Sequence, residues 1–179
     1  YALAKIAGIE ACWSYNRQYG TKYLAVMPTN LYGPGDNYHP SESHVLPGLI
    51  QRFHAAHKNQ DPEVSVWGTG SALREFMFSA DIGNAIAFIL GLDEASFNDL
   101  VNPDQCPIIN MGSGDEISIH DLALKVAKVI RYEGKITFDH SKPDGTPRKL
   151  LDSSRLHNLG WKINTDLDEG IRIAYQDYL

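Results

Sequence analysis

The sequence is poor in cysteine and has no long apolar segment. Its 179 residues include two cysteines, Cys12 and Cys106, which lie far apart and form no C-x-x-C pair. This pattern disfavours a thiolate metal site and is typical of reduced thiols in a cytoplasmic protein. No apolar run reaches the length of a membrane span or of a signal-peptide core, so no membrane partner is expected.

Concentrated positive charge is also missing. Lysine and arginine number 16 against 22 aspartates and glutamates, which gives a net charge of -6, and the basic residues are scattered. Recognition of nucleic acid requires a basic stripe or patch, so the composition argues against a nucleic-acid partner. An anionic small molecule would have to meet a few local cations instead.

A glycine fingerprint for a dinucleotide is a third absence. The G-x-G-x-x-G turn lies between a strand and a helix because its backbone N–H groups must approach the pyrophosphate closely. The glycines of "GTGSALREF" and "MGSGDEIS" neither follow a long strand nor match that spacing. We therefore expect no complete dinucleotide-binding loop within these residues.

Helical and strand patterns alternate along the chain, which predicts an α/β fold with layered helices. The stretch 28–43 is rich in Pro, Gly, Asn and Ser and is long for a plain connection, which indicates a functional loop. Helices are predicted at about 1–19 and 44–58, after Phe78, from a cap at Ser118, from about Ser153, and from a cap at Thr165; strands are predicted at 23–27, 64–67, 107–110 and 135–138.

Tyr1 and Lys5 are four residues apart, a spacing that brings both side chains to one face of a helix. An ammonium beside a phenol favours the phenolate, so this tyrosine could exchange a proton with a substrate oxygen near neutral pH. The spacing alone is common by chance, and an exposed helical pair explains it equally well. Other parts of the sequence must decide between the two interpretations.

Four further stretches supply that context: "PTNLYGPGDNYHPSESHV", "LIQRF", "VWGTGSALREF" and "PDGTPRKLLDSSRLHNLGW". Together with "YALAK" they closely resemble the GDP-L-fucose synthases, a branch of the extended short-chain dehydrogenase/reductases, over essentially the whole chain. The resemblance implies the C-terminal part of an NAD(P)-binding Rossmann-type fold with a smaller α/β substrate-binding domain. Residues 1–31 would then be a remnant of the dinucleotide-binding domain, and residues 32–179 mainly the substrate-binding domain, with some segments returning to the first.

The resemblance also implies an NADP(H) enzyme that converts GDP-4-keto-6-deoxy-D-mannose to GDP-L-fucose. The sugar is epimerised at C3 and C5 and its C4 carbonyl is then reduced. Tyr1 matches the proton donor to the C4 oxygen, and Lys5 the residue that lowers the pKa of the tyrosine and holds the nicotinamide ribose. His44 matches an acid/base of the epimerisation. Neither cysteine of the chain matches the family's catalytic cysteine.

Binding roles follow from the same motif matches. Residues that match cofactor contacts are Lys5, Pro28, Thr29, Asn30, Leu31 and His44, and residues that match substrate contacts are Arg52, Trp67, Arg74, Asp144 and Lys149. Arg52 follows His44 by eight residues, which on a helix places both on a broadly similar face. Without these matches, an arginine would be interpreted as an ordinary surface residue, and His44 as a histidine that caps or lines the start of a helix. The chain departs from the usual family pattern at Gly48, where alanine is more common, and this glycine should loosen the helix that carries Arg52 by up to about 1 kcal/mol.

The resemblance places the glycine-rich loop and the catalytic cysteine upstream of Tyr1, so we expect these residues alone to be inactive. We also expect the first helix and the strand after it to expose apolar surface, and the protein to form a homodimer through the tyrosine-bearing helix. Three alternatives stay open: another nucleotide-sugar epimerase or dehydratase without the His44 role, a non-catalytic GDP-sugar-binding module, and a structural fragment without a ligand.

Overall fold

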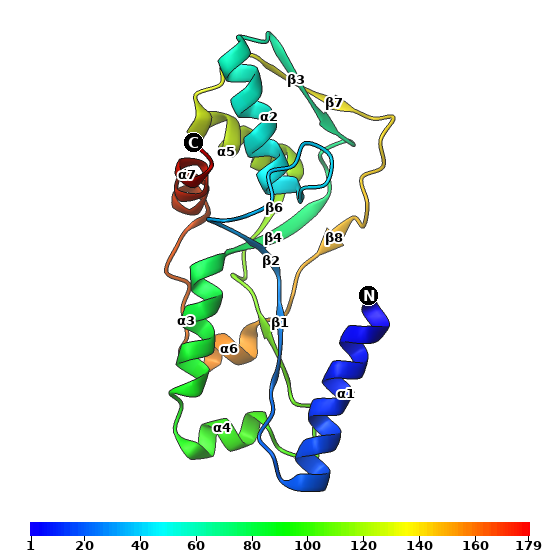
Figure 1. The fold of residues 1–179 in the computed structure, drawn as a ribbon, viewed down its shortest axis with the longest axis vertical. Coiled ribbons are helices and arrows are strands. Elements are labelled where there is room, and N and C mark those ends of the chain that lie inside the picture. Colours follow the sequence, from blue (N-terminus) through cyan, green and yellow to red (C-terminus); the bar gives the residue numbers. More distant parts are fainter.

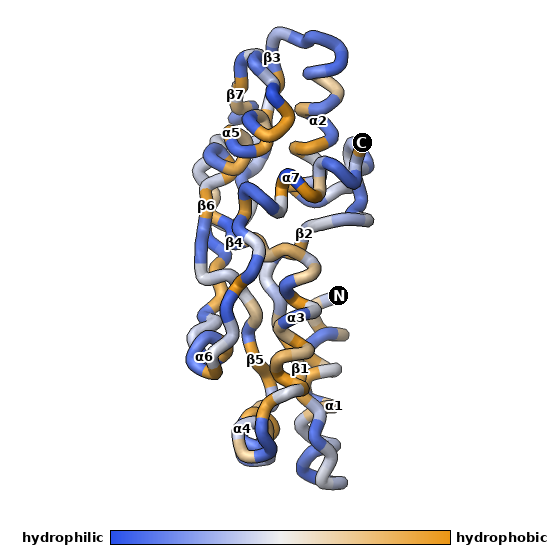
Figure 2. The backbone as a smooth tube through the Cα atoms, turned by 90° about the vertical axis from the view of Figure 1, so that its left-hand side faces the viewer, coloured by the Kyte–Doolittle hydropathy of each residue, from blue (hydrophilic) through white to orange (hydrophobic).

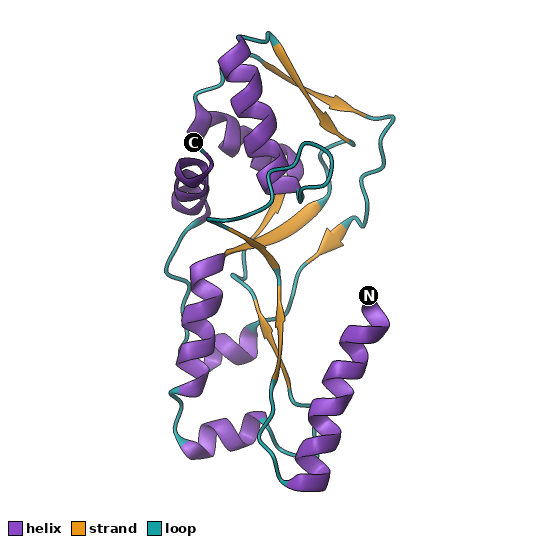
Figure 3. Cartoon of the chain, in the orientation of Figure 1, coloured by secondary structure: helices purple, strands orange, loops and turns teal.

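The computed structural model describes residues 1–179 and shows an α/β protein in which helices flank short strands (Figure 3). No helix combines the length and apolar content that a membrane crossing needs. The helices are α1 (Ala2–Tyr19), α2 (Val45–Asn59), α3 (Ser79–Leu90), α4 (Glu94–Leu100), α5 (Ile119–Ile130), α6 (Ser154–Asn158) and α7 (Leu167–Tyr178). The strands are β1 (Ala25–Pro28), β2 (Asn30–Tyr32), β3 (Glu63–Trp67), β4 (Leu73–Phe78), β5 (Ile108–Met111), β6 (Glu116–Ser118), β7 (Lys135–Asp139) and β8 (Arg148–Lys149).

Parallel pairing dominates three small sheets. β1 pairs with β5, and β3 pairs with β7, both in parallel. β4 is the centre of the third sheet: it pairs in parallel with β2 and β8 and antiparallel with β6. Parallel neighbours need crossover connections, and the helices α2, α3 and α5 lie within these connections.

Two apolar cores occupy the two ends of the elongated molecule (Figure 1). The large core has 18 buried residues, mostly from α2, β3, α5 and α7, and Phe53 and Ile50 at its centre are fully buried. The small core has 8 buried residues, from β4, α3, α4, β5, α6 and the segment that follows α6. Figure 2 shows hydrophobic residues along β1 and β5, which belong to the end of the molecule that holds the small core.

β4 joins the two cores because successive side chains of a strand point to opposite faces. Phe76 and Phe78 are buried in the large core, whereas Met77 between them is buried in the small core. Glu75 is two residues from Met77 and is also fully buried. The strand therefore fixes the position of one core relative to the other.

Most predicted elements are confirmed. The helices predicted at 1–19 and 44–58 are α1 and α2, and the helix predicted from Ser118 is α5, whose cap Ser118 accepts a hydrogen bond from the Asp121 backbone N–H. The predicted strands correspond to β1, β3, β5 and β7 within one or two residues. These segments have strong local patterns, namely helical periodicity, caps and short apolar runs.

The prediction of Thr165 as the cap of the last helix is wrong. Asp166 caps α7 and accepts from the Glu169 N–H, while the Thr165 N–H donates to the buried carboxylate of Asp81 at 3.0 Å. A buried carboxylate requires hydrogen-bond donors, and it takes this one from the segment before the helix. The strands β2, β4, β6 and β8 and the helix α4 were not predicted, because most are short and their pairing is long-range.

α1 and β1 form a layer with little apolar cover, which confirms the expected exposure. In α1, Leu3 is 82% exposed and Ile6 is 54% exposed. Asn16 is the one buried residue of this helix; its side chain donates to the Tyr23 carbonyl and accepts from the Tyr23 N–H, both at 2.8 Å. This layer, α1 with β1, is therefore attached largely by polar contacts.

Candidate functional site

A cavity of about 250 Å³ lies between the start of α2 and the end of β3. It brings together three of the predicted site residues, His44, Arg52 and Trp67. Serine hydroxyls and aliphatic side chains complete the wall, so the cavity can contact both polar and apolar parts of a ligand. The lining residues are Pro40, Ser41, Ser43, His44, Val45, Gly48, Leu49, Arg52, Val66, Trp67 and Ile119.

His44 is the residue before the first turn of α2, with an extended backbone of φ -68° and ψ 165°. Its side chain makes no capping hydrogen bond, and its ring takes part in no hydrogen bond or ion pair within the chain. His44 therefore occupies the N-cap position at the start of α2, but its side chain does not cap the helix. Its exposed imidazole is available to exchange a proton with a ligand in the cavity.

Arg52 lies two turns further along α2 and reaches the same cavity, as the spacing from His44 predicts. It donates to the Ser65 carbonyl at 2.8 Å, and its guanidinium carbon lies 5.5 Å from the centre of the Trp67 ring. Burial lowers the pKa of the Arg52 guanidinium. A bound anion would offset the energetic cost of burying the positive charge, so this is a suitable position for a phosphate.

Trp67 ends β3 and presents its ring largely to solvent, with 57% of the residue exposed. A second cation, the ammonium of Lys142, lies 5.8 Å from the ring centre. An exposed ring beside two cations can stack on the flat base of a nucleotide while the cations face the phosphates of the same nucleotide. No sequence pattern predicts a role for Lys142, because only the tertiary structure brings the loop after β7 next to β3.

Asp144 lies outside the cavity and holds the turn that follows β3. Its carboxylate accepts from the Thr69 N–H at 2.6 Å and from the Thr69 hydroxyl at 2.8 Å. The hydroxyl bond and then the backbone bond lower the pKa of the Asp144 carboxyl. A side chain at Gly68, where φ is 83°, would collide with this carboxylate. The substrate contact predicted for Asp144 would therefore have to use the remaining lone pairs of its oxygens.

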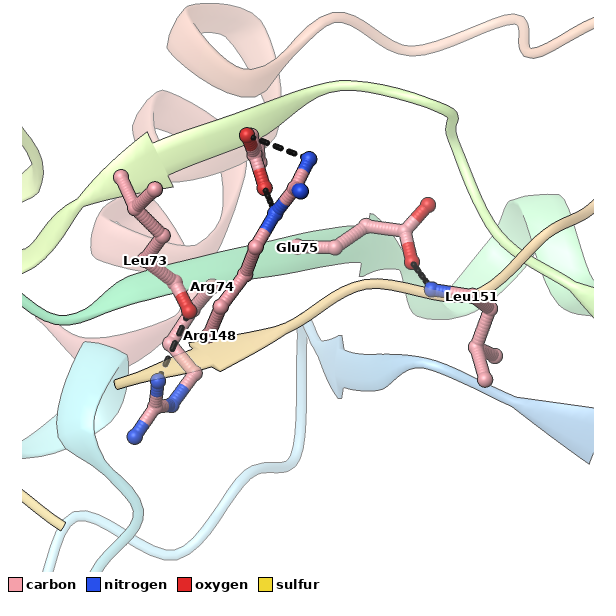
Figure 4. Close-up of polar contacts among 6 residues, drawn as sticks. Leu73, Arg74, Glu75, Arg148 and Leu151 are labelled. Carbon is pink, nitrogen blue, oxygen red and sulfur yellow. Dashed lines mark hydrogen bonds and ion pairs between the residues drawn. The ribbon is translucent and has the colours of Figure 1, made fainter. Parts of the chain in front are cut away.

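Arg74 and Lys149 are register partners on the neighbouring strands β4 and β8. Arg74 donates to the Leu73 carbonyl at 2.7 Å, and Figure 4 shows its guanidinium beyond β8, away from Glu75. Neither residue lines the cavity around His44. Both bear cationic groups at one edge of the third sheet, where an extended ligand could reach them.

Tyr1 and Lys5 share one face of α1, as predicted. The Lys5 ammonium lies 5.4 Å from the centre of the Tyr1 ring. Tyr1 is 97% exposed and does not line the cavity that contains His44. In Figures 1 and 2 this end of α1 lies at mid-height along the molecule, between the two cores.

Residues 28–31 comprise the end of β1, Thr29 and the start of β2, and they lie between the two cores. Thr29 is buried, and its hydroxyl and the side-chain amide of Asn30 both donate to the backbone carbonyl of Glu75, at 3.2 and 2.7 Å. Pro28 is exposed at the carboxyl end of β1. Ligands of α/β proteins bind beyond the carboxyl ends of parallel strands, so this position suits one end of a cofactor.

A larger hollow of about 570 Å³ lies near the segment after β8. It is lined by Arg148, His157 and residues 150–154, and none of the predicted site residues belongs to it. Arg148 is paired there with Glu116 at 2.8 Å. No group of three or more His, Cys, Asp or Glu side chains in residues 1–179 could hold a metal ion.

The parallel strands, the crossover helices and the cavity define an α/β enzyme fold of the extended short-chain dehydrogenase/reductase type. The chain belongs to the NAD dependent epimerase/dehydratase family, whose model matches residues 1–102.

Two relatives show where the chain lies within this family. It is 50% identical over 179 residues to the GDP-L-fucose synthase of Escherichia coli (strain K12), covering 100% of this chain and 56% of the relative. It is 49% identical over 183 residues to GDP-L-fucose synthase 1 of Arabidopsis thaliana, covering 100% of this chain and 52% of the relative. The chain thus spans about half the length of these curated relatives.

One solved structure also matches nearly the whole chain. A GDP-6-OMe-4-keto-L-xylo-heptose reductase from C. jejuni matches with a TM-score of 0.86 and 32% identity, covering 98% of this chain and 59% of that chain. All three matches cover 98% or more of this chain.

Proposed function

We propose that this chain is the substrate-binding and tyrosine-bearing portion of a GDP-L-fucose synthase. The whole protein would convert GDP-4-keto-6-deoxy-D-mannose to GDP-L-fucose by epimerisation at C3 and C5 and NADPH-dependent reduction at C4. The observation that carries this proposal is the cavity in which His44, Arg52 and Trp67 meet, in a chain half identical to a curated enzyme of that name.

The epimerisation needs a group that moves protons at carbon. The hydrogens beside a ketone are acidic because the carbanion spreads onto the carbonyl oxygen, provided that a donor stabilises this oxygen. The free imidazole of His44 can accept or return such a proton. Tyr1 would donate its hydroxyl hydrogen bond to the carbonyl oxygen.

The reduction uses the same tyrosine. NADPH supplies the hydride when it is bound, and Tyr1 gives its proton to the C4 oxygen. The Lys5 ammonium, on the face of the same helix, stabilises the phenolate that remains. Only the nicotinamide end of the cofactor would be held by the residues present, because the chain contains no glycine-rich phosphate loop. These residues are Pro28, Thr29, Asn30 and Leu31, at the end of β1 and the start of β2.

The substrate is held by cations and one aromatic ring. Arg52 and Trp67 would contact the nucleotide within the cavity, and Arg74 and Lys149 would contact phosphate or sugar oxygens at the sheet edge. Asp144 would keep the turn 68–70 in place and contribute its remaining lone pairs. We also propose that the protein acts in the cytoplasm and as a homodimer, which the exposed apolar residues of α1 favour.

The test is turnover of the keto sugar by the full-length protein in deuterated water. We expect NADPH oxidation and deuterium at C3 and C5 of the product. His44→Gln should lower deuterium incorporation by about 10²–10⁴-fold, and Tyr1→Phe should lower the reduction by a similar factor. Substrate consumption without deuterium at either carbon would contradict the proposal.

A second candidate is a GDP-sugar reductase that does not epimerise its substrate, favoured by the similarity to the C. jejuni heptose reductase. Such an enzyme would oxidise NADPH without solvent exchange at C3 and C5. In that case His44→Gln would leave the reduction nearly unchanged, whereas Tyr1→Phe would still impair it.

A further inference from the structure

Glu75 is a buried carboxylate that no cation neutralises. It is 0% exposed on β4, and none of the ion pairs in the chain includes it. Burial of an unpaired charge is costly unless donors surround it. Its carboxylate accepts from the Gly114 N–H at 2.8 Å, the Ser113 hydroxyl at 3.4 Å and the Leu151 N–H at 3.4 Å.

The backbone of the same residue binds a further segment. The Glu75 carbonyl accepts from the Thr29 hydroxyl and from the Asn30 side-chain amide. One residue thus joins three segments that are far apart in sequence: 29–30, 113–114 and 151. The first of these carries the proposed cofactor contacts, and the third follows Lys149.

The contact to Leu151 adds to the attachment of β8, which also includes the paired side chains of Arg148 and Glu116. The parallel ladder of β8 with β4 contains only the pairs Leu73–Arg148 and Arg74–Lys149. The Glu75 side chain continues this attachment beyond the end of the ladder, as Figure 4 shows for its bond to Leu151.

We infer that Glu75 is a positioning residue of the sugar-nucleotide site: its carboxylate fixes the segment after β8 and thereby keeps Lys149 beside Arg74. The inference rests on the proposed function, because it assigns those two cations to the substrate. Glu75 is buried behind them and does not touch the ligand. Its effect is on the affinity for the GDP moiety and not on proton or hydride transfer.

Gly112 supports this role independently. A Cβ atom at residue 112 would lie 2.7 Å from the Glu75 carboxyl carbon, and the backbone of Gly112 does not itself require glycine. The space left by the missing side chain is therefore occupied by the carboxylate. Gly112→Ala should displace the carboxylate without changing any charged or ligand-binding residue.

The experiment measures GDP affinity by calorimetry, with KM and kcat for the keto sugar, in the full-length protein. In Glu75→Gln the amide NH2 must face a backbone N–H, so one of the two attachments is lost. We expect the Kd for GDP and the KM to rise about tenfold, the loss of about one charge-assisted hydrogen bond, with kcat changed less than about twofold. Gly112→Ala should raise the same two quantities.

A double-mutant cycle tests whether the effect passes through Lys149. If Glu75 acts by placing this lysine, Glu75→Gln should weaken GDP binding far less in a Lys149→Ala background than in the wild type. The matched control is Asp81→Asn, a second buried carboxylate that accepts hydrogen bonds from Thr165. It should lower the melting temperature and leave the Kd for GDP unchanged.

The outcomes separate the inference from the proposed function. A wild-type protein that fails to bind GDP overturns the proposed function and the inference with it. If the wild type binds GDP but Glu75→Gln and Gly112→Ala lower stability without raising the Kd, Glu75 is only structural and the inference alone is wrong. Full additivity with Lys149→Ala would also overturn it. If Glu75→Gln does not fold, the test uses Gly112→Ala instead: its Kd for GDP, alone and in the Lys149→Ala background, then shows whether the inference holds.

Discussion

The large core and the α1–β1 layer show how differently helices of one chain can be held. α5 gathers its apolar residues on one face and buries them, with Leu122 and Val126 fully inside the large core. The apolar residues of α1 spread around the helix and stay largely exposed. Both sequences form helices, so local pattern decides helix formation, whereas burial depends on which partners are present.

The same contrast separates the two ends of the proposed site. His44, Arg52 and Trp67 are positioned by α2 and β3, which are packed on the large core. Tyr1 and Lys5 extend from the α1–β1 layer, where the attachment is mostly polar. The binding end of the site is thus built within residues 1–179, and the proton-donating end depends on how α1 is held.

The largest expected difference is between a core substitution and a layer substitution. Phe53→Ala should lower the free energy of unfolding of the chain by about 3–5 kcal/mol, because Phe53 is fully buried against Tyr132. Leu3→Ser should change it by less than about 0.5 kcal/mol, because Leu3 is 82% exposed. Urea denaturation of residues 1–179 measures both, and equal losses would contradict the comparison.

A smaller effect is expected where α1 is tied to the segment after it. Asn16→Ala removes both bonds to Tyr23 and should destabilise this attachment by about 1–2 kcal/mol. Amide hydrogen exchange should speed up in α1 and stay unchanged in α2. Equal acceleration in both helices would mean that the layer and the large core unfold as one unit.

A pH-dependent effect is expected within the large-core region. Tyr38 donates to the Ala174 carbonyl at 3.0 Å, and burial, followed by the charges of Asp177 and Asp36, raises its pKa from 10.0 to about 12. The neutral phenol is favoured in the folded state, so its contribution is complete below pH 10 and is lost as pH rises towards 12. Tyr38→Phe should show a shallower loss of thermal stability between pH 10 and 12. An unchanged slope would contradict this assignment.

The smallest effect is expected at Gly48 in the wall of the cavity. Gly48→Ala should stabilise α2 by less than about 1 kcal/mol, because alanine has the higher helix propensity. An added Cβ would meet the Ser43 hydroxyl at 2.8 Å, and this hydroxyl can rotate away. Thermal unfolding measures the gain; a loss of more than 1 kcal/mol would mean that Ser43 cannot move.

Part of the site could be predicted because its signals are local. The Tyr1–Lys5 spacing gives a shared helical face, and the eight-residue spacing of His44 and Arg52 gives a broadly similar face of α2, which in the structure lines the cavity. The engagement of Asp144 by Thr69 and the approach of Lys142 to Trp67 could not be predicted, since each joins segments about 75 residues apart.

The sequence by itself determined the α/β class, the main helices with the Ser118 cap, and the residue types of the proposed chemistry. Periodicity and capping act over a few residues, so they can be recognised without the fold. The tertiary structure alone decided the pairing of β4 with β2, β6 and β8, the cap at Asp166, and the burial of Glu75 among three distant segments. Strand pairing and the satisfaction of a buried charge depend on contacts between distant residues, which local pattern does not contain.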